Sequence, residues 1–328
     1  MRVHDSSGLQ ALLRRAHPES SRFGVRLSEV SRWQIGGPAL VVVEPRSIAE
    51  AADVVALMRD RIEPMLVVGD MSNVLFDSDG FDGVIIRIGR SLSTMRALGT
   101  MVHAEAGIAI PQLARATADL GLSGLEHTVG IPGTLGGLVT MNGGSQRKGI
   151  GLSVARVTCL DRSGNVLEFT QSECQFGYRS STLQRPDLIV AAVELQLEPR
   201  DSIEVHAEMD EVVESRRARF PEDLPNCGST FLSDPSMYEI IGAPGKAIES
   251  VGLKGYSYGG AQVSPQHANF VVNTGGATSD DVLAVIHHIR ETVHRSTGFA
   301  MDCEVRYVSP DGDVVPAHIA AEERRRVA

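Results

Sequence analysis

A glycine-rich run between Gly121 and Ser145 constrains the fold of this chain more than any other feature. It reads GLSGLEHTVGIPGTLGGLVTMNGGS and contains eight glycines. Glycine loses more conformational freedom on folding than any other residue, so such a run is favoured only where the backbone itself is needed. Successive backbone N–H groups form a concavity that binds anions, and tight corners between strands are the other common use of glycine. We therefore expect either a cradle for a diphosphate or a series of tight turns.

The order of the glycines distinguishes this run from two common nucleotide motifs. It contains neither Gly-x-Gly-x-x-Gly nor Gly-x-x-x-x-Gly-Lys-Ser/Thr. Instead, GIPGT from Gly130 to Thr134 is followed by Gly136-Gly137 and Met141-Asn142. These residues resemble the flavin-binding segment of the UDP-N-acetylenolpyruvoylglucosamine reductases (MurB), a family whose FAD domain is of the vanillyl-alcohol-oxidase (PCMH) type.

Further segments resemble the same family, in the same order along the chain. They are WQIGGPA from Trp33, FGYRSS from Phe176, PNCGSTF from Pro225, GLKG from Gly252, GGAQVS from Gly259, HANF from His267 and EVR from Glu304. The resemblance covers roughly residues 30–310. It implies an α+β fold in which a two-part FAD-binding domain precedes a smaller α+β substrate-binding domain.

Composition restricts the class of protein further. The chain has 328 residues and a formal net charge of −10, which argues against a general binder of nucleic acid or membrane surfaces. Its four cysteines lack Cys-x-x-Cys or metal-ligand spacing. No apolar run approaches the length of about 18 residues that a membrane span needs. The charged N-terminal segment does not suit a secretory signal. We expect a cytoplasmic protein with reduced thiols and no metal, nucleic-acid, membrane or protein partner. We expect His287, His288 and His294 to be solvated or packed.

Short apolar runs alternate with helical patterns in the first half of the chain. We expect strands at residues 40–43, 65–68 and 84–88, a helix at 47–60, and a second helix from Pro111 to Gly121. Ser47 and Glu50 predict a capping box at the start of the first helix. Strand and helix units in this order predict a sheet with helices packed against it.

From residue 154 the pattern changes to β-hairpins. A turn at 161–165 is predicted between strands at 155–160 and 166–169, and another strand follows at 189–197. The last part predicts a strand at 270–272, a helix at 280–297 and a strand at 303–308. Thr278 and Asp281 predict a capping box for that helix, and Gly298 predicts its end.

These elements predict domains that are continuous in sequence. We expect an N-terminal extension at 1–22, an FAD-binding domain at 23–200 with subdomains at about 23–90 and 91–200, a substrate-binding domain at 201–315 and a solvated charged tail at 316–328. The main boundary is placed before a charged helical stretch that begins after Asp201.

The resemblance implies that NADPH, through FAD, reduces the enolpyruvyl group of UDP-N-acetylglucosamine enolpyruvate to give UDP-N-acetylmuramate for peptidoglycan precursors. A flavin can pass a hydride to an electron-poor alkene, but the carbanion left beside the carboxylate must be stabilised and protonated. By resemblance, Arg179 and Glu304 stabilise this intermediate and Ser229 protonates it. The residues alone also allow Arg179 as a surface ion-pair partner, Ser229 as a turn residue and Glu304 as a cross-strand partner.

The resemblance also implies two sets of binding residues. FAD is expected at Gly69, Ser72, Asn73, Gly133, Thr134, Gly137 and Asn142. The UDP-sugar is expected at Tyr178, Arg219, Lys254 and Gln262.

One loop departs from the family pattern. Residues 69–73 read GDMSN, so Met71 stands where the family has a second glycine. A bulky side chain there, with Asp70 beside it, should weaken FAD binding unless Asp70 points away from the diphosphate. This departure leaves open a related FAD oxidoreductase with another nucleotide-sugar or secondary-metabolite substrate, and a homologue that binds flavin without turnover.

Overall fold

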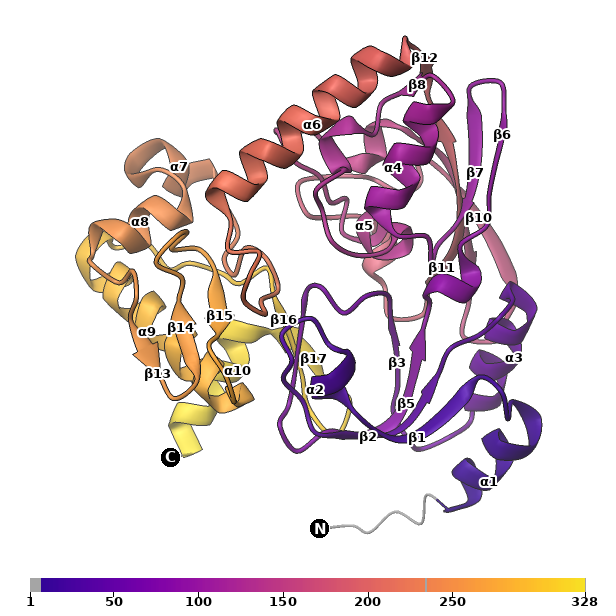
Figure 1. Ribbon diagram of the computed structural model, residues 1–328. Coiled ribbons are helices and arrows are strands. Elements are labelled where there is room, and N and C mark those ends of the chain that lie inside the picture. Colours follow the sequence, from indigo (N-terminus) through magenta and orange to yellow (C-terminus); the bar gives the residue numbers. More distant parts are fainter. Residues whose placement is uncertain (1–6, 234, 328) are drawn as a thin grey trace. The chain divides into compact units, whose positions relative to one another are not determined.

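The computed structural model of this protein describes residues 7–233 and 235–327, and Figure 1 shows its helices and strands. The chain divides into two compact units, each assembled from separate stretches of sequence. Unit 1 consists of the described residues within 1–22, 42–70 and 85–216, and unit 2 of those within 23–41, 71–84 and 217–328. Two short segments of the N-terminal half thus belong to the same unit as the C-terminal third. The continuous domains stay a prediction.

A five-stranded antiparallel sheet forms the centre of unit 1. Its order is β10 (Val166–Thr170), β9 (Val154–Leu160), β11 (Ile189–Gln196), β7 (Met101–Glu105) and β6 (Met95–Leu98). The predicted hairpin between β9 and β10 is confirmed, with Val166 opposite Leu160. The Asp161 carboxylate closes its turn by accepting hydrogen bonds from the Ser163 and Asn165 N–H groups, at 2.7 and 2.9 Å.

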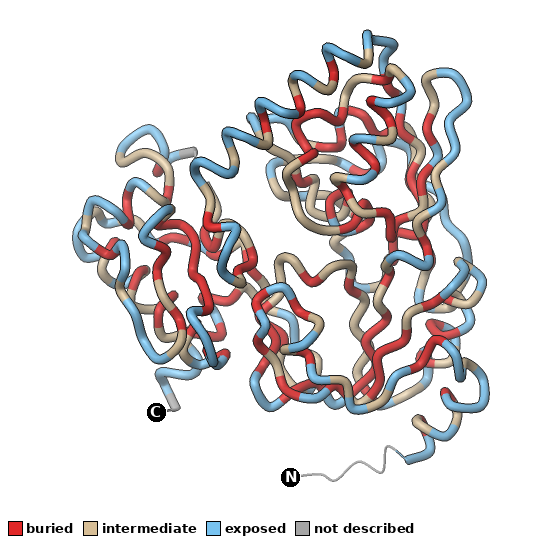
Figure 2. The backbone as a smooth tube through the Cα atoms, viewed as in Figure 1, coloured by how far each residue is buried: buried red, intermediate tan, exposed pale blue. Residues whose placement is uncertain are grey.

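A second sheet has four strands in the order β1 (Ser21–Arg26), β2 (Pro38–Val43), β5 (Phe81–Arg87) and β3 (Met65–Val68). It confirms the strands predicted at 40–43, 65–68 and 84–88. The chain passes between the two units within β1, β2 and β5. Figure 2 shows the buried residues along β2 and β5, where Val41–Val43 and Val84–Ile86 are fully buried.

Two helices of unit 1 begin close to their predicted positions. Helix α3 (Ile48–Met58) starts at Ser47, whose side chain accepts a hydrogen bond from the Glu50 N–H group at 3.0 Å. The reciprocal half of the capping box is wrong, because the Glu50 carboxylate accepts from the Arg46 N–H group instead, at 2.7 Å. Helix α4 (Ile110–Asp119) has its proline in the first turn, as predicted, and is followed by Gly121 at a φ of 67°.

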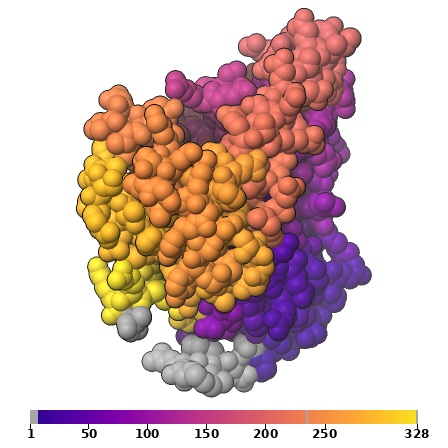
Figure 3. Space-filling view, turned by 60° about the vertical axis from the view of Figure 1, so that its left-hand side comes forward, coloured from indigo at the N-terminus to yellow at the C-terminus, as the bar shows by residue number. Residues whose placement is uncertain are grey.

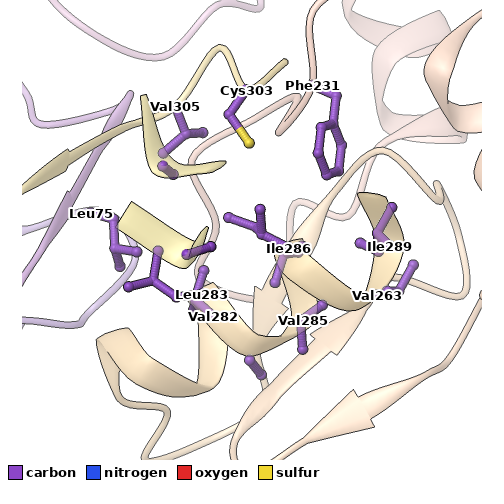
Figure 4. Packing of buried hydrophobic residues seen from close by; sticks show 14 of the residues in the cluster. Leu75, Phe231, Val263, Val282, Leu283, Val285, Ile286, Ile289, Cys303 and Val305 are labelled. Carbon is purple, nitrogen blue, oxygen red and sulfur yellow. The ribbon is translucent and has the colours of Figure 1, made fainter. Parts of the chain in front are cut away.

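Unit 2 packs a long helix against a small sheet. Helix α9 (Ser279–Thr297) has both hydrogen bonds of the predicted capping box, and Gly298 ends it at a φ of 78°. The sheet consists of β13 (Ser257–Tyr258), β14 (Ala261–Val263) and β15 (Val271–Asn273). Figure 4 shows the buried core of unit 2, in which Val282 and Ile286 of α9 lie among residues from four other segments, including Leu75, Phe231, Val263 and Cys303.

The strand predicted at 303–308 is shorter than expected. Strand β16 (Arg306–Val308) pairs with β4 (Val74–Phe76) and with β17 (Val314–Pro316). Residues 303–305 lie outside it, and Cys303 instead forms an isolated bridge with Phe231.

The charged C-terminal tail is exposed at residues 323–326, and Arg324 in addition makes contacts with buried groups. Helix α10 (Ala317–Val327) carries this residue, whose guanidinium bonds the buried Asp77 carboxylate and the Tyr307 hydroxyl. Burial, followed by the Asp77 hydrogen bond, raises the pKa of Tyr307 to about 12, so the phenol stays protonated and donates to Asp77.

The remaining α-helices and strands have the following bounds. They are helices α1 (Ser7–Ala16), α2 (Leu27–Val30), α5 (Leu135–Thr140), α6 (Ser202–Arg219), α7 (Pro235–Ile241) and α8 (Pro244–Ser250), and strands β8 (Leu122–Ser123) and β12 (Glu198–Pro199). In the space-filling view, α7, α8 and α9 of unit 2 form much of the near surface, in orange and yellow (Figure 3). Among the described residues, no helix has the length and apolar character that a membrane crossing needs.

Candidate functional site

The glycine-rich run forms a backbone concavity in unit 1. Gly133 has a φ of 129°, and its carbonyl accepts a hydrogen bond from the Ile110 N–H group at 3.1 Å. Leu135 donates its N–H to the Ile108 carbonyl at 3.0 Å. Between these two anchored peptides, no hydrogen bond joins the N–H groups of Gly133 or Thr134 to another described residue. Two adjacent backbone donors are therefore available for an anion.

Two of the predicted FAD segments meet at this concavity. A Cβ atom added to Gly69 would overlap Thr134 Oγ1, and one added to Gly137 would lie 3.9 Å from the same oxygen. Thr134 is only 8% exposed. The structure thus brings Gly69, Gly137 and Thr134 together, and glycine at position 69 is required by the close approach of the Thr134 side chain.

The loop at residues 69–73, which differs from the family pattern, buries Met71 and pairs Asp70 with an arginine. Met71 adopts a φ of 53° and is 2% exposed, so its side chain is buried in the protein. The Asp70 carboxylate pairs with the Arg87 guanidinium at 3.3 Å, and Arg87 also pairs with Glu44 at 3.2 Å. The charge of Asp70 is therefore compensated within the protein, and the half-buried Ser72 follows in unit 2.

Asn142 holds the loop that carries two predicted substrate and catalytic residues. Its amide Nδ2 donates to the Gly177 carbonyl at 2.7 Å, and its Oδ1 accepts from the Gly151 N–H group at 3.0 Å. The turn at Gly177 presents Tyr178, which is 58% exposed, and Arg179, whose guanidinium carbon lies 5.5 Å from the Tyr178 ring centre. Arg179 has a φ of 50°, a left-handed conformation that costs free energy in a residue with a side chain.

Ser229 and Glu304 lie on two neighbouring segments of unit 2. The Glu304 N–H group donates to the carbonyl of Thr230, the residue after Ser229, at 2.9 Å. Asn73 bonds the same segment, because its Nδ2 donates to the Glu304 carbonyl at 3.1 Å. The structure thus brings together two predicted catalytic residues and one residue of the predicted FAD loop. Arg179 belongs to unit 1.

The predicted cations of the substrate site surround a cluster of rings in unit 2. Phe220 stacks on Phe270 at 5.1 Å and contacts His267 at 5.2 Å, and the Arg219 guanidinium lies 5.6 Å from the Phe220 ring centre. Burial, followed by the positive charges of Lys254 and Arg219, lowers the pKa of His267. The imidazole is therefore neutral near pH 7, with both cations close to it.

Gln262 supports this cluster indirectly. Its Nε2 donates to the Gly255 carbonyl at 3.3 Å and to Ser257 Oγ at 2.9 Å, which holds the turn after Lys254. The Lys254 ammonium pairs with Glu249 at 2.9 Å. An anion at this cluster would therefore compete with a carboxylate that is 58% exposed.

One basic residue that sequence reasoning did not single out lies against the glycine-rich run. Arg216, near the end of α6, lies across Gly130 at the start of GIPGT, where an added Cβ would collide with its side chain. The charge pattern of α6 contains several arginines and gives no means of selecting this one. Among the described residues, no three His, Cys, Asp or Glu side chains are grouped so as to hold a metal ion.

The fold and the glycine-rich concavity are those of an FAD-binding protein. Residues 39–170 match the sequence profile of an FAD binding domain, which agrees with the cradle at Gly133 and Thr134. Residues 220–308 match the profile of the UDP-N-acetylenolpyruvoylglucosamine reductase C-terminal domain. The chain belongs to the UDP-N-acetylenolpyruvoylglucosamine reductase family.

Individual relatives support this assignment over almost the whole chain. UDP-N-acetylenolpyruvoylglucosamine reductase 1 of Corynebacterium glutamicum is 50% identical over 97% of this chain and 95% of its own length. The reductase of Heliobacterium modesticaldum is 38% identical over 88% of this chain and 91% of its own. The crystal structure of the Thermus caldophilus reductase (MurB) superimposes with a TM-score of 0.74 and 29% identity, covering 86% of this chain and 97% of that one. The predicted family and α+β fold are confirmed.

Proposed function

We propose that this protein is an FAD-dependent oxidoreductase that uses NADPH to reduce UDP-N-acetylglucosamine enolpyruvate to UDP-N-acetylmuramate, a step in peptidoglycan precursor synthesis. The observation that carries the proposal is the junction at which the Glu304 backbone bonds the Thr230 carbonyl, next to Ser229, and the Asn73 amide. It places the proposed proton donor, the proposed acidic residue and a residue of the predicted FAD loop on adjoining segments. The relatives of that name extend over nearly the full chain.

The residues of the concavity fit FAD. The close contact at Gly69 leaves no room for a Cβ, and Gly133 and Thr134 offer adjacent N–H donors of the kind that bind a diphosphate. When bound, FAD supplies the hydride transfer that no side chain can perform. Gly137 lies beside the same Thr134 hydroxyl. We assign Ser72 to FAD from the family motif alone, while Asn73 and Asn142 act at least partly through the protein contacts described above.

The chain's own chemistry then concerns charge and protons. Once the alkene carbon of the enolpyruvyl group has accepted a hydride, the adjacent carbon carries negative charge beside a carboxylate. In our proposal Arg179 binds that carboxylate, since a guanidinium offers two parallel N–H donors. Glu304 stabilises the enol-like intermediate, and Ser229 Oγ gives its proton to the carbon.

The UDP portion of the substrate is assigned to the cations of unit 2. Arg219 and Lys254 stand near the neutral His267, so a diphosphate there would meet two positive charges, and the imidazole would add no third one near pH 7. Tyr178 completes the proposed substrate contacts from the loop held by Asn142. We place the reaction in the cytoplasm. No observation favours the alternative of a different nucleotide sugar.

Purification and two measurements test the proposal. The protein should carry FAD that denaturation releases, and NADPH oxidation should require the enolpyruvyl sugar nucleotide. A protein that binds FAD and oxidises NADPH equally with and without this substrate would contradict the substrate assignment. A protein that takes up no FAD would contradict the enzyme class.

A further inference from the structure

Two buried asparagines fix the backbone on either side of Ser229. Asn226, which is 6% exposed, acts on the N-terminal side. Its Oδ1 accepts a hydrogen bond from the Gly228 N–H group at 2.9 Å, and its Nδ2 donates to the Pro221 and Leu224 carbonyls at 2.8 Å each. The side chain therefore ties the residue before Ser229 to the loop that follows α6.

Asn269, which is 5% exposed, acts on the C-terminal side. Its Oδ1 accepts from the Phe231 N–H group, and its Nδ2 donates to the Phe231 carbonyl, both at 3.0 Å. Its backbone carbonyl accepts from the Thr230 N–H group at 2.8 Å. The side-chain amide thus acts as a neighbouring strand would, satisfying both polar groups of one peptide residue.

Ser229 is the residue between these fixed peptides. Gly228 allows the sharp entry at a φ of 76°, and the Thr230 carbonyl accepts from the Glu304 N–H group at 2.9 Å. No hydrogen bond from Ser229 Oγ reaches another described residue, so the hydroxyl itself is available to a ligand. The backbone on either side of Ser229 is thus held by hydrogen bonds, while its hydroxyl bonds no residue that the structure describes.

We infer that Asn226 and Asn269 are positioning residues for Ser229, holding its hydroxyl in line with the carbon that it protonates. This inference rests on the proposed function. Proton transfer is sensitive to placement, and a displacement of about 1 Å lowers the rate by a factor on the order of 10². The two asparagines thus act on the protonation step and not on hydride entry from NADPH.

The test compares Asn269→Asp with Asn273→Asp in the FAD-loaded protein. Aspartate at 269 replaces the donor facing the Phe231 carbonyl with an oxygen, so the two acceptors repel each other and the peptide shifts. Asn273 is a matched control, since it is also 5% exposed, donates to the Trp33 carbonyl at 3.0 Å, and accepts from Gly275 and Ala277 N–H groups at 2.9 and 3.2 Å. Its side-chain amide makes the same kinds of bond but does not contact residues 226–231; the backbone N–H of Asn273, which the substitution leaves unchanged, donates to the Pro225 carbonyl at 2.9 Å.

Stopped-flow absorbance separates the two half-reactions. For Asn269→Asp we expect flavin reduction by NADPH to stay within about twofold of the parent rate, and reoxidation by the enolpyruvyl substrate to slow by about tenfold or more. The solvent deuterium isotope effect on reoxidation should increase, because protonation becomes more rate-limiting. Asn273→Asp should leave the isotope effect at the parent value.

Several outcomes would overturn the inference. If Asn269→Asp and Asn273→Asp slowed reoxidation equally, Asn269 would be a structural residue only. The same conclusion would follow if Asn269→Asp slowed flavin reduction as much as reoxidation. Should Asn269→Asp not fold, Asn226→Ala must show the same split between half-reactions. A parent protein whose flavin NADPH reduces, but which this substrate does not reoxidise, would instead refute the proposed function on which the inference rests.

Discussion

Replacing Met71 by glycine and, separately, by alanine distinguishes the contribution of its side chain from that of its backbone. The side chain is 2% exposed, so its removal in either variant costs about 2–5 kcal/mol of folding free energy. The backbone has a φ of 53°, where a Cβ atom costs about 1–2 kcal/mol and glycine costs nothing. The greater freedom of glycine in the unfolded chain offsets about 0.4–1 kcal/mol of this difference.

We therefore expect both variants to be less stable than the parent, with Met71→Gly more stable than Met71→Ala by about 1 kcal/mol. Urea denaturation followed by circular dichroism measures the order. The protein should be stripped of flavin, because a bound ligand stabilises the folded state and obscures the difference.

A buried methionine in a helix provides the control. Met209 of α6 is also 2% exposed, and in a helix interior alanine is more stable than glycine by about 1 kcal/mol. The order of the two variants should therefore reverse at position 209. If Met71→Ala proved at least as stable as Met71→Gly, the argument from left-handed backbone strain would be refuted.

Three further predictions address the site. Ser229→Ala should leave flavin reduction by NADPH nearly unchanged and slow reoxidation by the substrate by a factor on the order of 10² or more; reoxidation at the parent rate would exclude Ser229 as proton donor. Gly69→Ala should raise the dissociation constant of FAD by at least about tenfold, because the added Cβ displaces Thr134. Gly89→Ala is the control: a Cβ added there comes no closer than 3.9 Å to another group, so FAD affinity should equal that of the parent. The pKa of His267 is lowered from 6.5, mainly by burial, so its contribution to stability is complete above about pH 6.5 and is lost as the pH falls below that value. His267→Asn should therefore show a smaller loss of stability than the parent between pH 7 and pH 5 in urea denaturation; an identical loss would mean that His267 is not neutral in the folded protein.

Local patterns were sufficient to predict most regular elements. Each end of α9 is set by neighbouring residues: the capping box by Thr278 and Asp281, and the C-terminal end by Gly298. These local interactions depend little on the rest of the chain. The box at Ser47 failed in one half because the Arg46 N–H group competes for the Glu50 carboxylate, and local spacing does not decide that competition.

The site was predictable only as separate pieces. The family motifs placed Ser229, Glu304 and Asn73 in the sequence, but the bond between Asn73 and Glu304 joins residues 231 positions apart. Cys303 forms an isolated bridge with Phe231 and lies outside β16, and this pairing across 72 positions likewise has no local signal. The pairing of Arg324 with Asp77 joins residues 247 positions apart, so the local charge pattern of the tail could not predict it.

The placement of Trp33 within unit 2 has a consequence for the order in which this chain folds during synthesis. Its indole Nε1 donates to the Val271 carbonyl at 3.0 Å, and its own carbonyl accepts from Asn273 Nδ2 at 3.0 Å. A ribosome must therefore translate more than two hundred further residues before the partners of Trp33 exist. Trp33 is the only tryptophan of the chain, and it is 1% exposed. Its fluorescence is thus a built-in optical reporter of the moment at which unit 2 closes around its N-terminal segment.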